Sequence, residues 1–136
     1  MQDRPSATEL LAAVRDFLQQ EIIPTLDDHR QKFRTLVAAN VLGIVGRELP
    51  GEEERLRAEW ARLAALDHTE EAEPALPATL DRLRAEIDIR KRALCDRIRA
   101  GEADAGPWRY DVLAYVHWSL EEKLRVANPR FLERLS

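Results

Sequence analysis

The sequence predicts an all-α fold, a single-domain antiparallel bundle of about five helices followed by a short C-terminal helix. Three observations support this prediction. Apolar residues recur every three or four positions along most of the 136 residues. Glycine and proline number only 5 and 7, which favours a few long helices over a sheet with many turns. The length suits one domain, covering residues 1–136.

Composition excludes several classes of function. The net charge of −4 disfavours nucleic acid as a partner, because affinity for nucleic acid comes mainly from neutralising phosphates. A single cysteine excludes an intramolecular disulfide and a zinc site made of cysteines alone. No run of apolar residues is long enough to span a membrane, and no secretion signal is recognisable, so we expect a cytoplasmic protein without a membrane partner.

The first helix is predicted to run from a capping box, Ser6 with Glu9, to about Ile22. Pro24 ends or kinks it, because proline lacks an N–H and clashes with the preceding turn. Four apolar residues share one side of this helix and are predicted to face the core: Leu10, Val14, Phe17 and Leu18.

The second helix is predicted to begin at Asp28, which repeats the capping pattern with Gln31, and to stop at Pro50-Gly51. Large apolar side chains recur along it at helical spacing, and we expect this face to join the core. They are Phe33, Leu36, Val37, Val41, Ile44 and Val45.

Small residues form a second stripe on the same helix, at Ala39, Gly43 and Gly46. Glycine costs about 1 kcal/mol relative to alanine inside a helix, so this stripe predicts the close approach of a neighbouring helix. Asn40 lies among the apolar residues and is predicted to be buried. Its amide then needs partners, either to set the register between helices or to line a small polar pocket.

The third helix is predicted to begin in the acids of 52–54, and the fourth to run from about Ala78 to Ala100, ended by Gly101. An acidic, proline-containing loop at 67–77 separates them. The apolar stripes predicted to face the core are Leu56, Trp60, Leu63 and Leu66, then Leu80, Leu83, Ile87, Leu94 and Ile98. Cys95 is expected to be buried, since free cysteine behaves as a small apolar residue.

The fifth helix is predicted to open at Pro107, and Asn128 with Pro129 to start the short final helix. The predicted core face of the fifth helix consists of Leu113, Val116, Leu120 and Leu124. Tyr115 and Trp118 fall off that face, so they predict either a partner surface or a patch that the final helix covers.

Candidate chemistry is sparse. His29, His68 and His117 are widely separated and form no pair at i, i+3 or i, i+4, so we expect no metal site. His117 lies on the predicted core face and is expected to be partly buried. The arginines between 82 and 99 alternate with acids, which is typical of a solvated helix surface. Nucleophile and phosphate-binding motifs are missing, so neither enzymatic activity nor a cofactor is expected.

Four segments resemble one known family. They are MQDRPSATELLAAVRDFL at the start, EIIPTLD after it, FRTLVAANVLGIVGREL, and KLRVANPRFL near the end. On these segments the chain resembles a bacterial family designated a domain of unknown function. The resemblance implies a small stand-alone helical protein, encoded near aminoglycoside-phosphotransferase-like kinases and acyl-CoA dehydrogenases. Among the polar residues of the matching segments we single out Arg4, Asn40, Asn128 and Arg130, and we expect Arg4 or Arg130 to hydrogen-bond across the end of the bundle.

Together these observations predict a non-catalytic accessory or interaction protein, bound to a kinase-like or dehydrogenase-like enzyme or to its own copies. The partner surface would be the Tyr115–Trp118 side or the small-residue stripe. The alternative is a bundle that binds an acyl or phosphorylated metabolite, in a pocket lined by Asn40 and His117 with an arginine at its mouth. The candidate binding residues are Arg4, Asn40, Tyr115, His117, Trp118, Asn128 and Arg130.

Overall fold

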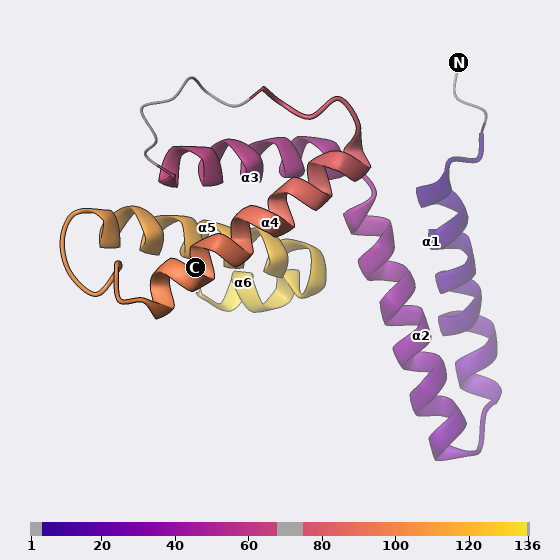
Figure 1. Ribbon diagram of the computed structural model, residues 1–136. Coiled ribbons are helices and arrows are strands. Elements are labelled where there is room, and N and C mark those ends of the chain that lie inside the picture. Colours follow the sequence, from indigo (N-terminus) through magenta and orange to yellow (C-terminus); the bar gives the residue numbers. More distant parts are fainter. Residues whose placement is uncertain (1–3, 68–74, 136) are drawn as a thin grey trace. The chain divides into compact units, whose positions relative to one another are not determined.

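The computed structural model describes residues 4–67 and 75–135, and these contain six α-helices and no strand (Figure 1). The all-α prediction is therefore confirmed. The helices are α1 (Ala7–Phe17), α2 (His29–Glu48), α3 (Glu52–Leu66), α4 (Leu80–Arg99), α5 (Trp108–Ala127) and α6 (Pro129–Leu135). Most of the predicted acidic loop, including His68, lies outside the described residues. The chain divides into two compact units, residues 1–51 and 52–136.

The first unit is a hairpin of α1 and α2. At its start, the backbone N–H of Glu9 donates to Ser6 Oγ (3.3 Å) and that of Ser6 donates to Glu9 Oε2 (2.7 Å), which confirms the predicted capping box. Helical winding continues beyond α1 as one π-helical turn, Leu18–Ile22, and a 3₁₀ turn, Ile23–Thr25. Asp28 then caps α2 by accepting the backbone N–H of Gln31 (2.8 Å), as predicted.

The small-residue stripe of α2 packs against α1. Ala39 has no exposed surface and Gly43 is buried. A methyl group placed on Gly43 would lie 3.4 Å from the Arg47 guanidinium and 3.7 Å from the Arg15 side chain, whereas one on Gly46 would meet nothing within 4 Å. The predicted close approach of a helix is confirmed at Ala39 and Gly43, and is wrong at Gly46.

The large apolar side chains of the hairpin, which the sequence predicts in the core, are mostly exposed. They include Leu10, Val14 and Phe17 of α1 and Phe33, Leu36, Val37 and Val41 of α2. The reason is geometric: within the hairpin each helix packs against one other helix, and α2 turns its small residues toward α1. Asn40 is exposed for the same reason, so its predicted burial is wrong.

The second unit holds a continuous apolar core built from α3, α4 and α5. Its buried members are Trp60, Leu63, Leu66, Leu83, Ile87, Leu94, Val112 and Tyr115. The predicted core faces of α3 and α4 are thus confirmed apart from Ile98, which is 37% exposed. Gly101 adopts a positive φ of 85° just after α4, which confirms the predicted helix stop. Cys95 is exposed rather than buried, because the side of α4 that meets α3 and α5 carries Leu94 instead.

The core side of α5 is not the predicted one. Val112, Tyr115 and Ser119 face the core, while Leu113, Val116 and Leu120 are exposed. Both sets recur at helical spacing, so the apolar pattern alone does not decide which set is covered.

The small-residue contact yields a stability prediction. Gly43→Leu should be less stable than Gly46→Leu by about 1 kcal/mol or more, because the larger side chain has to displace the Arg15 and Arg47 side chains, which offsets the gain of leucine in a helix. Gly46→Leu is the matched control and should be neutral or stabilising by up to about 1 kcal/mol, since leucine favours helix and the space is open. Thermal unfolding followed by circular dichroism measures both variants, and an equal change in stability for the two substitutions would contradict the assignment.

Candidate functional site

A hydrogen-bonded cluster fixes α5 against α3 and α4. The Tyr115 hydroxyl donates to Glu59 Oε1 (2.9 Å), and Lys91 Nζ lies 2.7 Å from the same oxygen. Burial raises the pKa of Tyr115 above its ordinary value, and the charge of the Glu59 carboxylate raises it further. A phenol held in its protonated form beside a carboxylate serves as a donor, so this cluster is structural.

Trp118 packs against this cluster instead of forming a free surface. Its ring lies 6.3 Å from that of Tyr115, centroid to centroid, and the Arg62 guanidinium lies 4.5 Å from the Trp118 centroid. Tyr115 itself is only 7% exposed. The predicted off-core aromatic pair is therefore wrong, because α5 turns this side toward α3. The other predicted partner surface, the small-residue stripe, is occupied by α1 at Ala39 and Gly43.

Three exposed apolar side chains on α5 form the first candidate interaction surface, which we call the α5 outer stripe. Leu113, Val116 and Leu120 are 52%, 46% and 55% exposed. A hollow of about 450 Å³ adjoins the stripe. Its lining residues are Ile98, Ala103, Asp104, Arg109, Val112, Leu113 and Val116. The polar end of this hollow is braced by Arg109, whose guanidinium donates to the backbone carbonyl of Asp104 (3.2 Å).

A second hollow, of about 310 Å³, lies beside Tyr115. It is lined by Arg62, Ala65, Leu66, Asp111, Ala114 and Tyr115. Its cation, Arg62, already stacks on Trp118, so this hollow adjoins packed residues of the core.

The polar residues singled out from the sequence do not converge. His117 is exposed rather than partly buried, and its Nδ1 lies 3.8 Å from Glu121 on its own helix. Asn40 belongs to the first unit and His117 to the second, and neither lines one of the two hollows. Arg4 and Arg130 are both exposed. Asn128 follows α5, and its backbone carbonyl accepts the N–H of Phe131 (3.1 Å).

Five of the six arginines of α4 are paired with acids, as the alternating charges predict. Arg84 joins α4 to α3 through Glu52 (2.5 Å), and this contact raises the pKa of the guanidinium. The remaining ion pairs are Arg82–Glu86, Arg84–Asp81, Arg90–Asp67, Arg97–Glu102 and Arg99–Asp96. This surface therefore presents mixed charge.

Within residues 4–67 and 75–135, no cluster of three or more histidine, cysteine or acidic side chains is placed to hold a metal ion. In the same part of the chain, no helix has the length and apolar character that crossing a membrane requires.

A family model matches most of this chain, apart from the first of the four segments that carry the resemblance, residues 1–18. The model of the family described as domain of unknown function DUF6285 matches residues 24–131. The chain belongs to this family. The match spans α2 to α5 and reaches into α6, so both exposed apolar helices, α2 and α5, lie within the family's domain. Comparisons with curated proteins and with solved structures give no match.

Reasoning from the sequence did not predict the exposed apolar faces of α2 and α5. A signal was present on α5, since Val112, Tyr115 and Ser119 repeat at the same spacing as the predicted core face. Where two stripes compete on one helix, only one of them need be covered within the unit.

The Tyr115 cluster predicts an alkaline loss of stability. The pKa of Tyr115 is 10.0 when unfolded and higher when folded, so above pH 10 the unfolded state releases a proton that the folded state keeps. Stability should be unaffected by this group below pH 10 and fall as pH rises beyond it. Tyr115→Phe should remove this dependence and cost about 1–2 kcal/mol at neutral pH, through the lost hydrogen bond to Glu59.

Tyr110→Phe is the matched control, because the Tyr110 side chain is 73% exposed. It should leave both the neutral-pH stability and the alkaline loss unchanged. Urea unfolding at a series of pH values measures the two variants, and an alkaline loss of equal size in Tyr115→Phe would exclude Tyr115 as its source.

Proposed function

We propose that this chain is a non-catalytic interaction protein that binds another protein through the α5 outer stripe. The observation that carries the proposal is the position of Leu113, Val116 and Leu120 at i, i+3 and i+7, half exposed on a helix whose other side is already packed. Apolar residues at this spacing are the usual anchors by which helices dock into a partner.

The chemistry of the stripe indicates the kind of partner. Apolar burial contributes roughly 25 cal/mol per Å², so three half-exposed side chains supply a useful driving force together with the adjoining hollow. Asp104 and Arg109 form a polar edge to that hollow and favour one orientation of the incoming segment. An amphipathic helix with an apolar face and a charged edge matches this surface.

The accessory role predicted from the sequence suggests which class of protein the partner belongs to. The family resemblance implies that such chains are encoded near aminoglycoside-phosphotransferase-like kinases and acyl-CoA dehydrogenases, and we propose that one of these enzymes supplies the docking helix. The chain itself would contribute a binding surface. Among the ionisable groups at its core, Tyr115 and Lys91 both bond to Glu59.

A small-molecule ligand is the second candidate, favoured by the hollow beside the α5 outer stripe. Its volume of about 450 Å³ falls within the range of ligand pockets, and Arg109 offers a cation for a phosphate or carboxylate. A ligand at about 100 times its Kd would add roughly 2.7 kcal/mol to stability. A thermal-shift panel of acyl-CoAs and phosphorylated alcohols therefore separates the two candidates.

Direct binding of the purified chain to each enzyme class tests the accessory role. A Val116→Glu variant should weaken binding by about 30-fold, because it buries a charge at the centre of the stripe. Ile89→Glu is the matched control, since Ile89 is 63% exposed on α4 and lies outside the stripe, and it should bind normally. Isothermal titration calorimetry measures both variants. Binding that survives Val116→Glu, or a thermal shift with metabolites in the absence of protein binding, would rule against the accessory role.

A further inference from the structure

The α5 outer stripe continues into a basic side chain at each of its ends. Arg109 lies four positions before Leu113, and Lys123 lies three positions after Leu120. From Arg109 to Lys123 the positions therefore alternate in steps of four and three, which keeps all of them on one side of the helix. The two cations are two heptads apart, roughly 21 Å along the helix axis.

Neither cation is neutralised by the part of the chain that the structure describes. On α5 no acid stands three or four positions from Arg109 or Lys123, and neither side chain forms an ion pair with a described residue. The Arg109 guanidinium donates to the backbone carbonyl of Asp104 and keeps further N–H groups for a partner. The Asp104 carboxylate lies against Gly101 instead, with Oδ2 3.1 Å from the place that a methyl group on that glycine would take.

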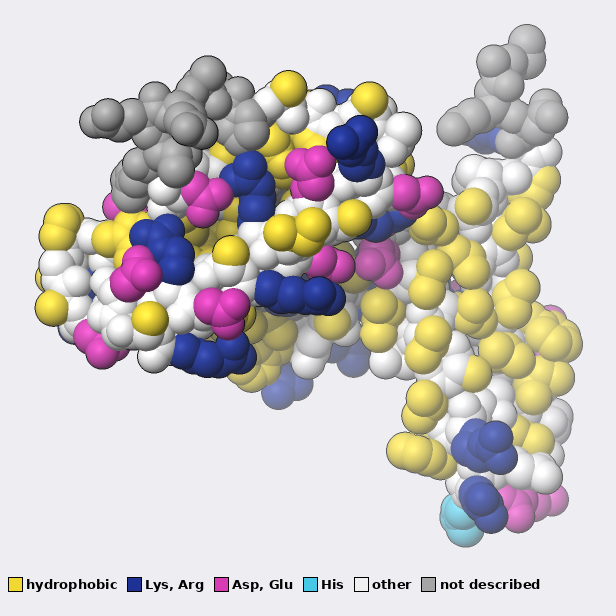
Figure 2. Space-filling model, in the orientation of Figure 1, with side chains coloured by type: hydrophobic (Ala, Val, Ile, Leu, Met, Phe, Trp, Pro, Cys, Tyr) yellow, Lys and Arg dark blue, Asp and Glu magenta, His cyan; other side chains and the backbone are white. Residues whose placement is uncertain are grey.

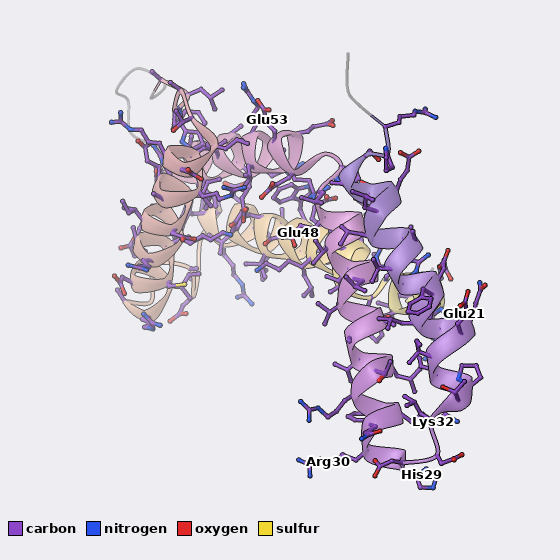
Figure 3. All side chains as sticks on the ribbon, turned by 90° about the vertical axis from the view of Figure 1, so that its right-hand side faces the viewer. Glu21, His29, Arg30, Lys32, Glu48 and Glu53 are labelled. Carbon is purple, nitrogen blue, oxygen red and sulfur yellow. The ribbon has the colours of Figure 1, made fainter. Side chains whose placement is uncertain are left out.

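Most other basic side chains of the second unit pair with acids of the same unit. Arg125 pairs with Glu122 on α5, and five of the six arginines of α4 pair in the same way. Figure 2 shows the result on α4, where basic and acidic side chains are interleaved. In the first unit, Arg30 and Lys32 lie near one end of α2 but on different sides of that helix (Figure 3), so they do not extend one stripe. The α5 outer stripe differs in having an unpaired cation in line with each end.

We propose that the helix which docks on the α5 outer stripe carries an acidic residue at each end of its own apolar seam, one facing Arg109 and the other facing Lys123. This inference rests on the proposed function and adds the chemistry of the partner. Each carboxylate would neutralise a cation that the chain leaves unpaired, and opposite charges across an interface raise the association rate and disfavour wrong partners. The hollow beside Leu113 and Val116 offers room for one large apolar side chain of that helix.

The same charges disfavour a second copy of this chain as the occupant. Two α5 helices paired antiparallel about Val116 would set Arg109 of each copy against Lys123 of the other. A parallel pair would set each cation against its own equivalent. Both arrangements place like charges together at both ends of the stripe, which weakens the pair, so the partner is a different helix.

The width of the α5 outer stripe favours a helix over an anionic membrane. At 100° per residue, Leu113, Val116 and Leu120 fall within about 60° of one another around α5. So narrow a stripe suits the seam between two helices, whereas a helix that lies in a membrane surface buries a broad apolar face. Beside the stripe, exposed His117 lies near Glu121, so polar groups border its apolar residues.

Two synthetic peptides test the sign of the charges. Both are amphipathic helices of two heptads with leucine along the seam, and they differ in having glutamate or lysine at the two ends. The glutamate-ended peptide should bind the full chain on the order of tenfold more tightly at low salt, because the lysine-ended peptide replaces attraction by repulsion at both ends. The preference should shrink as salt is added. Fluorescence anisotropy of the labelled peptides measures both dissociation constants.

Charge reversal in the chain tests where the peptides bind. Lys123→Glu should abolish the preference between the two peptides, and the double variant Arg109→Glu/Lys123→Glu should reverse it in favour of the lysine-ended peptide. Arg92→Glu is the matched control, since Arg92 is exposed on α4 and lies outside the stripe, and it should keep the wild-type preference. Circular dichroism checks that all three variants fold.

The outcomes separate this inference from the proposed function. Equal binding of both peptides, lost in Val116→Glu, overturns the charge pairing and leaves apolar docking on the stripe in place. Peptide binding that survives Val116→Glu overturns both, because the peptide then lies elsewhere. If neither peptide binds, the inference is overturned, and titration with the two enzyme classes still decides the proposed function. Tighter binding to vesicles of phosphatidylserine and phosphatidylcholine, weakened by Lys123→Glu, assigns the stripe to a membrane surface instead.

Discussion

A helix in a small helical unit has more circumference than its neighbours can cover, and this constraint shapes both units of the chain. In the hairpin, α2 has a single neighbour and turns toward it the side with the least side-chain volume, Ala39 and Gly43. At these positions the two backbones can approach closely, because the side chains between them are small. The large side chains of α2 are consequently left on the outside of the hairpin.

In the second unit, a polar group favours one side of α5 over the other as the covered side. α5 has two apolar stripes, and the covered one is the stripe that carries Tyr115, whose hydroxyl meets Glu59 and, through it, Lys91. Burying a hydroxyl without a partner costs about 1–3 kcal/mol, so α5 is stable in the orientation that supplies an acceptor. Arg62 over Trp118 and Arg97 over Trp108 add cation–π contacts on the flanks of the same helix.

The sequence predicted helix ends well and helix faces poorly, for one physical reason. Ends are set by local chemistry, so Ser6 with Glu9, Asp28 with Gln31, and Gly101 act as predicted. The faces of α3 and α4 also followed the pattern, because each has one dominant stripe. In α2 and α5 two stripes compete, and the choice depends on neighbours distant in sequence. The same ambiguity misplaced Asn40, Tyr115, His117 and Trp118 among the candidate site residues.

The exposure of Cys95 on α4 has a consequence for the covalent chemistry of this protein. It is the chain's only cysteine, so a disulfide formed on oxidation can join only two separate molecules, or this protein to another thiol. Its neighbours along the helix are Leu94, which is buried, and Asp96, whose carboxylate pairs with Arg99. Any thiol reagent therefore attaches at one defined position on the surface of the second unit, and a fluorophore or spin label there reports on that unit alone.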